Sequence, residues 1–172
     1  FGAKVLHPST VIPAIDAEIP LRIKNVFHPD FPGTVIAAKA ETGATAVKGI
    51  TAIPQMSLIS LEGAGMIGVN GVAARMFAAL ARAQINVLLI SQGSSEQSIC
   101  CVVRRETGDR AQTVLRKEFA GEFVRKEIRQ VACYNDIAIV AVVGSGMRGT
   151  PGISASLFSA LSKNKINVMA IA

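Results

Sequence analysis

The chain is organised around one glycine-rich stretch, Gly63-Ala64-Gly65-Met66-Ile67-Gly68-Val69-Asn70-Gly71. An apolar run at 56–61 precedes it, and residues 72–80 follow with apolar side chains at helical spacing. A second apolar run lies at 85–90. We therefore predict a strand, a glycine turn, a helix and a second strand. The first amides of such a helix lack internal partners and carry partial positive charge, so the turn is a candidate site for a carboxylate or phosphate.

The same pattern occurs a second time, 81 residues later (144 minus 63), in the stretch Gly144–Gly152. Phe158 then matches Phe77, and the Ile-Asn-Val run at 166–168 matches the one at 85–87. Between 56–91 and 137–172, 13 of the 36 aligned positions are identical, where chance would give about two or three. This similarity predicts a duplicated domain.

Composition indicates a folded chain with a large core. Of the 172 residues, 50% are hydrophobic and only 17% are charged, which is typical of globular domains and not of disordered segments. No apolar run approaches the roughly 18 residues of a membrane helix, and we see no secretory signal pattern. Three cysteines do not make a disulfide framework. Cys100 and Cys101 are neighbours on a predicted strand and should point to opposite faces, so we expect buried thiols, no metal site and a cytoplasmic location.

The net charge of +6 raises the question of nucleic acid binding. The chain has no Trp and one Tyr, and its cations are scattered. Proteins that bind single-stranded RNA on a similar sheet stack bases on aromatic side chains of the central strands, but the predicted strand at 98–103 has no aromatic residue. We therefore expect a solvated basic surface, with neither nucleic acid nor membrane as partner.

The order of elements predicts an α+β fold. Residues 47–61 predict one long or kinked strand, broken near Pro54. After it come a helix at 72–80, strands at 85–90 and 98–103, a helix at 107–120 and a strand at 123–133. The order βαββαβ is that of the ferredoxin-like fold, an antiparallel sheet with helices on one face.

The repeat also predicts how the domains are connected. Residues 47–133 hold one complete copy, whereas 134–172 stop after the second strand of the other. The leading residues 1–46 contain a predicted helix at 9–17 and a predicted strand at 19–26. We therefore expect 1–46 to complete the second copy, with the first copy inserted into it, and Leu21–Lys24 to pair with a strand from 137–172.

Several of these motifs together resemble the regulatory region of aspartate kinase. Residues 2–8, 19–25 and 32–34 resemble the stretch where the catalytic domain of that enzyme meets its regulatory domain. The glycine turns, the Ile-Asn-Val runs and Gln92-Gly93-Ser94-Ser95-Glu96 resemble its tandem ACT domains.

The resemblance implies a sensor of an amino acid. Aspartate kinases transfer the γ-phosphoryl group of ATP to aspartate, and their ACT pair binds an end-product amino acid that inhibits the kinase. ACT domains of this family pair side by side across subunits, so effectors lie at interfaces. The 92–96 turn is most like threonine-sensitive forms, including those fused to homoserine dehydrogenase, and lysine remains an alternative. The implied partners are the effector, further ACT domains and the chain's own catalytic domain.

No catalytic residue is expected in this chain. The kinase's nucleotide loop of Lys-Phe-Gly-Gly type is absent, and Gly63–Gly71 has no Gly-Lys-Ser/Thr ending. The resemblance gives ATP and Mg to the parent enzyme and no cofactor to this region, which should not phosphorylate anything by itself.

The candidate effector site combines the turn amides, which would hold a carboxylate, with the amides of Asn86 and Gln92, which would meet an ammonium or hydroxyl. Two alternatives remain open: the glycines serve only tight packing, or the region is a ligand-free assembly module. The methionines of the two turns are either plugs or contacts. The candidate residues of the first copy are Gly65, Met66, Ile67, Gly68, Val69, Asn70, Gly71, Val72, Asn86 and Gln92, and those of the second copy are Gly146, Met147, Arg148, Gly149, Gly152, Ile153 and Asn167.

Overall fold

The computed structural model describes residues 5–38, 46–93, 96–144 and 146–172. The expected loop at 43–45, the first four residues of the predicted junction, and Ser94, Ser95 and Ser145 of the turns lie outside these ranges. The chain divides into two compact units, one of residues 1–52 with 140–157 and one of 53–139 with 158–172. Each unit is described by itself.

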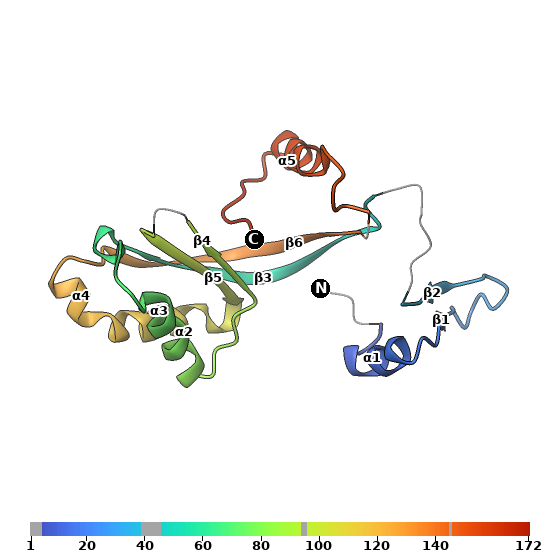
Figure 1. Ribbon diagram of the computed structural model, residues 1–172, viewed down its shortest axis with the longest axis horizontal. Coiled ribbons are helices and arrows are strands. Elements are labelled where there is room, and N and C mark those ends of the chain that lie inside the picture. Colours follow the sequence, from blue (N-terminus) through green and yellow to red (C-terminus); the bar gives the residue numbers. More distant parts are fainter. Residues whose placement is uncertain (1–4, 39–45, 94–95, 145) are drawn as a thin grey trace. The chain divides into compact units, whose positions relative to one another are not determined.

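A four-stranded antiparallel sheet carries the glycine turn. Its strand order is β4-β5-β3-β6, and Figure 1 shows α2, α3 and α4 on the same side of it. In chain order these elements are β3 (Gly49–Glu62), the short 3₁₀ helix η1 (Ala64–Met66), α2 (Val72–Arg82), β4 (Leu89–Gln92), β5 (Ser98–Arg104), α3 (Arg105–Glu118), α4 (Ala120–Val124) and β6 (Gln130–Val143). This order and topology confirm the predicted ferredoxin-like fold.

Alternation along the strands places a core on each face of the sheet. Ile59 and Leu61 of β3 pack with Met76 and Leu80 of α2 and Leu115 of α3. Alternate residues of β3 point to the opposite face of the sheet. There Met56 and Leu58 form a smaller cluster with Val102 of β5. Cys101 belongs to the helix-side core and Cys100 to the opposite face, as predicted. Burial raises the pKa of the Cys101 thiol to about 12.

Two predicted strands are corrected in this sheet. The strand expected at 85–90 begins later than expected, because β4 spans only Leu89–Gln92. The strand expected at 123–133 begins at Gln130, because 120–124 form α4, which continues the helical path past the fully buried Phe119. The break expected near Pro54 does not occur, because β3 runs unbroken from Gly49 to Glu62. The irregularity there is local: Gln55 has a left-handed backbone with φ of 59°.

The internal repeat is visible in the coordinates. β3 and β6 each have 14 residues and lie 81 positions apart (130 minus 49). The helix of the second copy, α5 (Ile153–Lys163), matches α2 with the same spacing (153 minus 72). The Arg129 N–H donates to the Glu62 carbonyl, and the Lys48 N–H donates to the Val143 carbonyl, both at 2.8 Å. Residues 46–48 therefore occupy the same position next to the end of β6 that residues 127–129 occupy next to the end of β3.

The strand expected at 166–168 is wrong. No strand is assigned after α5, and Ile166 and Val168 remain exposed. A strand needs a neighbour that accepts its hydrogen bonds, and within the described ranges none pairs with these residues.

The leading residues form a helix, α1 (Pro8–Asp16), and a hairpin of β1 (Leu21–Ile23) with β2 (Thr34–Ile36). The expected pairing of Leu21–Lys24 with a strand of 137–172 does not occur in the described residues, because β1 pairs with β2. The intervening loop, residues 24–33, turns at Gly33, with φ of 75°, so β1 finds its partner strand close by in the sequence. The assignment of 1–46 to the second copy stays a prediction.

None of the helices in the described ranges is long and apolar enough to cross a bilayer.

Candidate functional site

The first glycines of the turn allow the backbone of another segment to pack closely against it. The Gly63 N–H donates to the Gln97 carbonyl and the Gly65 N–H to the Glu127 carbonyl, both at 3.0 Å. A Cβ at Gly63 would lie 2.2 Å from the Glu127 oxygen, and one at Gly65 would lie 2.5 Å from the Glu127 Cα. For Gly65 these contacts favour the alternative that the glycine serves tight packing, because its N–H already donates to a backbone carbonyl within the fold.

The next amides of the turn are mostly paired as well. The N–H groups of Met66, Ile67 and Val69 donate to carbonyls three residues earlier, at 3.1–3.3 Å. The Met66 side chain is buried, so Met66 is a plug under the turn and not a surface contact. Of the predicted carboxylate donors, Gly68 and the residues from Asn70 to Val72 remain.

The start of α2 is uncapped. Gly71 stands at the N-cap with φ of 88°, makes no side-chain hydrogen bond, and no acidic residue lies in the first turn. The N-cap residue thus offers no side chain to the first helical amides, and no acidic side chain of the first turn lies beside them; their partial positive charge favours an anion. This is the electrostatic feature that the glycine pattern predicts.

A carboxylate already lies at the turn. Gly68 has a φ of 69°, and its N–H donates to the Glu96 Oε2 atom at 2.9 Å. Glu96 lies between β4 and β5, 28 residues further along the chain. The sequence pattern placed Glu96 in a motif but gave it no role, because only the tertiary structure brings the two turns together.

Gln92 is the last residue of β4, whereas Asn86 lies three residues before β4 begins. Gln92 pairs with Ile99, which pairs with Leu61, so Gln92 is at the end of the sheet where the glycine turn begins. Asn86 is exposed and precedes Gln92 by six residues, about 20 Å along an extended strand. The structure thus brings Gln92, but not Asn86, to the turn of the same chain.

Apolar side chains surround this turn on the surface. Ile67 is 51% exposed, Val69 is 55% exposed and Ile90 of β4 is 48% exposed. β4 is also the edge strand of the sheet. An exposed edge with apolar side chains is a surface on which a further strand can be added.

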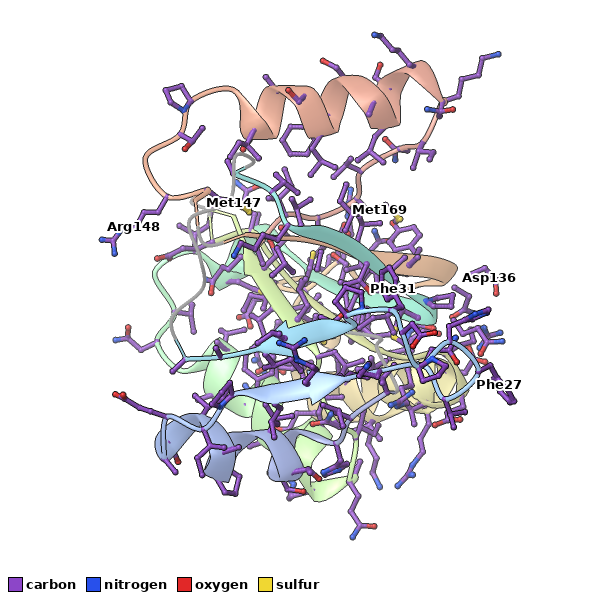
Figure 2. All side chains as sticks on the ribbon, turned by 90° about the vertical axis from the view of Figure 1, so that its right-hand side faces the viewer. Phe27, Phe31, Asp136, Met147, Arg148 and Met169 are labelled. Atoms are coloured by element: carbon purple, nitrogen blue, oxygen red, sulfur yellow. The ribbon has the colours of Figure 1, made fainter. Side chains whose placement is uncertain are left out.

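The turn of the second copy repeats the backbone of the first. Gly149 and Gly152 have φ of 79° and 89°, matching Gly68 and Gly71. A Cβ at Gly146 would lie 3.1 Å from the Ala46 Cα, so this glycine also permits close packing. The turn leads into Ile153, the first residue of α5. Met147 is half-buried and Arg148 is exposed, with its side chain pointing away from the ribbon in Figure 2.

Asn167 lies in a groove of about 740 Å³ on the open face of the sheet, together with Met169. Glu62 lines the same groove and accepts hydrogen bonds from Arg129 and Gln130 at 2.7 Å and from Ser60 at 2.8 Å. Desolvation raises the pKa of the Glu62 carboxyl, but these hydrogen bonds outweigh it and hold the pKa below its usual value. The polar groups satisfy one another, so this cluster ties β3 to β6. Within the described residues no group of three potential metal ligands gathers.

Comparison with known families identifies a domain in this chain. The sequence profile described as "ACT domain" matches residues 59–119 and 140–172. These ranges contain both glycine-turn helices, α2 and α5.

Similar proteins point to one enzyme class. A bifunctional aspartokinase/homoserine dehydrogenase of Haemophilus influenzae is 41% identical over 172 residues, which cover 100% of this chain and 21% of that protein. The chain thus spans about a fifth of the length of this curated relative. The aspartate kinase of Clostridium acetobutylicum has the same fold, with a TM-score of 0.83 and 24% identity, over 98% of this chain and 38% of its own. Aspartokinase III of E. coli, solved with lysine and aspartate, superposes with a TM-score of 0.72 and 28% identity over 100% of this chain and 37% of its own.

Proposed function

Because this chain belongs to the ACT-domain family, as a regulatory region of the aspartokinase type, we propose that it binds an end-product amino acid and thereby inhibits an aspartate kinase. The observation that carries the proposal is the uncapped start of α2 beside a glycine turn that already holds a carboxylate. Such a start suits the carboxylate that every free amino acid presents.

We propose threonine as the effector, with lysine as the alternative. Threonine is favoured because the similar Haemophilus protein is fused to homoserine dehydrogenase, whereas the solved E. coli enzyme is in complex with lysine. The effector's carboxylate would meet the amide of Gly68 and the amides from Asn70 to Val72. The amide of Gln92, at the same end of the sheet, would accept a hydrogen bond from the ammonium or the hydroxyl.

The site is completed by a second copy of the chain. β4 is an exposed edge strand. In an antiparallel pairing of two β4 strands centred on Leu89, the partner copy's residue 86 would lie opposite Gln92, because Leu89 is midway between them. This arrangement gives Asn86 a role that it cannot have within its own chain, and it covers Ile67, Val69 and Ile90.

Inhibition follows as a shift of population. An effector that binds one arrangement of paired ACT domains more tightly stabilises that arrangement by the difference in binding free energy, commonly about 1–3 kcal/mol. The residues before α1 would pass the change to the kinase domain. Val26, Phe27 and Phe31 of the β1–β2 loop are strongly exposed, and Figure 2 shows Phe27 pointing outward. They offer an apolar surface for that domain, to which ATP and Mg would belong; the ACT region itself is proposed to need no cofactor.

The test is calorimetric titration of the chain with threonine and with lysine. We expect threonine to bind, and Gln92→Ala to weaken its affinity about tenfold, since a charge-assisted hydrogen bond is lost. Gln97→Ala is the matched control, because it also truncates an exposed glutamine, and Gln97 lines the groove on the open face. Equal affinity of the Gln92→Ala and Gln97→Ala variants would remove Gln92 from the site.

The exposed apolar residues around β4 also favour a second function, an assembly module without a ligand. Ligand binding to the native state raises the melting temperature. If neither amino acid raises it at millimolar concentration while the chain still dimerises, the assembly function is the correct one.

A further inference from the structure

We propose that Glu96 is a built-in competitor of the effector: its carboxylate occupies the glycine turn in the ligand-free chain, and an amino acid must displace it to bind. The proposal rests on the proposed function and adds a mechanism that sets the affinity of the same site. It follows from one contact, the hydrogen bond of 2.9 Å from the Gly68 N–H to the Glu96 Oε2 atom.

The Gly68 amide is the turn's outward-facing donor. The amides of Gly65, Met66, Ile67 and Val69 donate to backbone carbonyls within the fold. The amide of Gly68 donates to a side chain from another loop, and a Cβ at Gly68 would meet no atom within 4 Å. The turn is therefore uncrowded on the Cβ side of Gly68, while the N–H itself is taken by the Glu96 carboxylate.

The contact comes with a conformational cost that ligand binding can release. Glu96 has a left-handed backbone with φ of 55°, and its N–H donates to the Gly93 carbonyl at 3.2 Å. This region is unfavourable for a residue other than glycine, because its Cβ comes too close to the following carbonyl oxygen. When an effector carboxylate takes the place of Glu96, the loop is free to relax.

Displacement of Glu96 also acts on the neighbouring contact. Gln92 ends β4, and Glu96 closes the turn that follows it. The state of Glu96 is thereby coupled to the residue proposed to hold the effector's ammonium or hydroxyl. While the Glu96 carboxylate occupies the site, the apparent affinity for the effector is lowered. The reason is that only the fraction of molecules with an open turn can bind it.

The test is the threonine and lysine titration repeated with Glu96→Gln. The amide side chain keeps the size of the carboxylate but competes less well for a backbone N–H, because hydrogen bonds to charged groups are stronger. We expect the apparent dissociation constant to fall about threefold to tenfold. Glu106→Gln is the control, because it removes one exposed negative charge at the start of α3 and should leave the affinity unchanged.

An independent readout is the NMR signal of the Gly68 amide. In the effector-free chain, Glu96→Gln should shift this signal, and threonine should shift it in the unmodified chain, because both remove the same carboxylate.

The outcomes separate the two proposals. If the unmodified chain binds an amino acid and Glu96→Gln binds it equally or more weakly, the competitor role is wrong and the effector site stands; weaker binding would make Glu96 a partner of the effector's ammonium. If only Glu96→Gln binds, both proposals are supported. If neither form binds threonine or lysine, both fail.

Discussion

The glycines of the first turn serve two different physical needs. Gly63 and Gly65 are required by space, because residues 127–128 approach their Cα atoms closely. Gly68 is required by backbone conformation, because its φ is 69° and no neighbour lies where a Cβ would be. The sequence alone cannot separate these needs, since both select the same residue type.

A pair of alanine substitutions distinguishes the two needs. Gly63→Ala should lower the free energy of unfolding by about 2–3 kcal/mol, because the added methyl group overlaps the Glu127 carbonyl. Gly68→Ala should cost only about 1 kcal/mol, the price of a left-handed alanine. Urea unfolding followed by circular dichroism measures both. A larger loss for Gly68→Ala would show that the 127–128 segment yields easily.

At the scale of elements, the glycine turn is held by contacts on both sides of the sheet. On the helix side, Arg75 of α2 bonds the Glu122 carboxylate of α4 at 2.5 Å, and its guanidinium lies 4.6 Å from the centre of the Phe119 ring. The Arg75 hydrogen bond lowers the pKa of Glu122 against the effect of burial. On the open side, Glu62 at the end of β3 bonds Arg129 and Gln130. These contacts fix the directions in which the strand enters the turn and the helix leaves it.

The Glu62 cluster predicts an acid-sensitive end of the sheet. Because the pKa of Glu62 is lower in the folded chain than its usual value of 4.5, the carboxylate stabilises the fold above pH 4.5, and this contribution disappears as the pH falls through the folded value. Glu62→Gln should therefore lose stability at pH 7 and show a smaller decrease of the melting temperature between pH 5 and pH 3 than the unmodified chain. Parallel pH curves for the two proteins would contradict this role.

At the scale of the whole molecule, we propose that self-association and effector binding depend on the same edge strand. β4 ends the sheet, and the proposed second copy adds to it there. A site that needs both copies binds its effector only in the associated state, so effector and association stabilise each other.

A charge on the edge strand should abolish both properties. Ile90→Lys places two like charges close together in an edge-to-edge pair and leaves the folded chain intact, because Ile90 is 48% exposed. We expect a monomer in analytical ultracentrifugation and at least tenfold weaker threonine binding. Val124→Lys, at an exposed position of α4, is the control and should remain associated. If Ile90→Lys stays dimeric, the copies meet through another surface.

The sequence by itself determined the repeat, the ferredoxin-like fold and the resemblance to aspartate kinase. Apolar periodicity and glycine spacing are local properties of the chain, and the spacing of 81 residues appears unchanged between β3 and β6 and between α2 and α5. The outer ends of elements were less predictable. Residues 120–124 became a helix and residues 166–168 no strand, because packing of Phe119 and the presence of a pairing neighbour decide these cases.

Only the tertiary structure decided which groups face the candidate site. It engaged the Gly65 amide in packing, buried Met66, left the start of α2 uncapped and brought Glu96 to Gly68. It also placed Gln92 at the end of β4 next to the turn and Asn86 ahead of the start of β4. The physical reason is that a hydrogen bond between residues 28 positions apart depends on the path of the sheet between them, whereas the pattern that forms each strand and helix depends only on near neighbours in the chain.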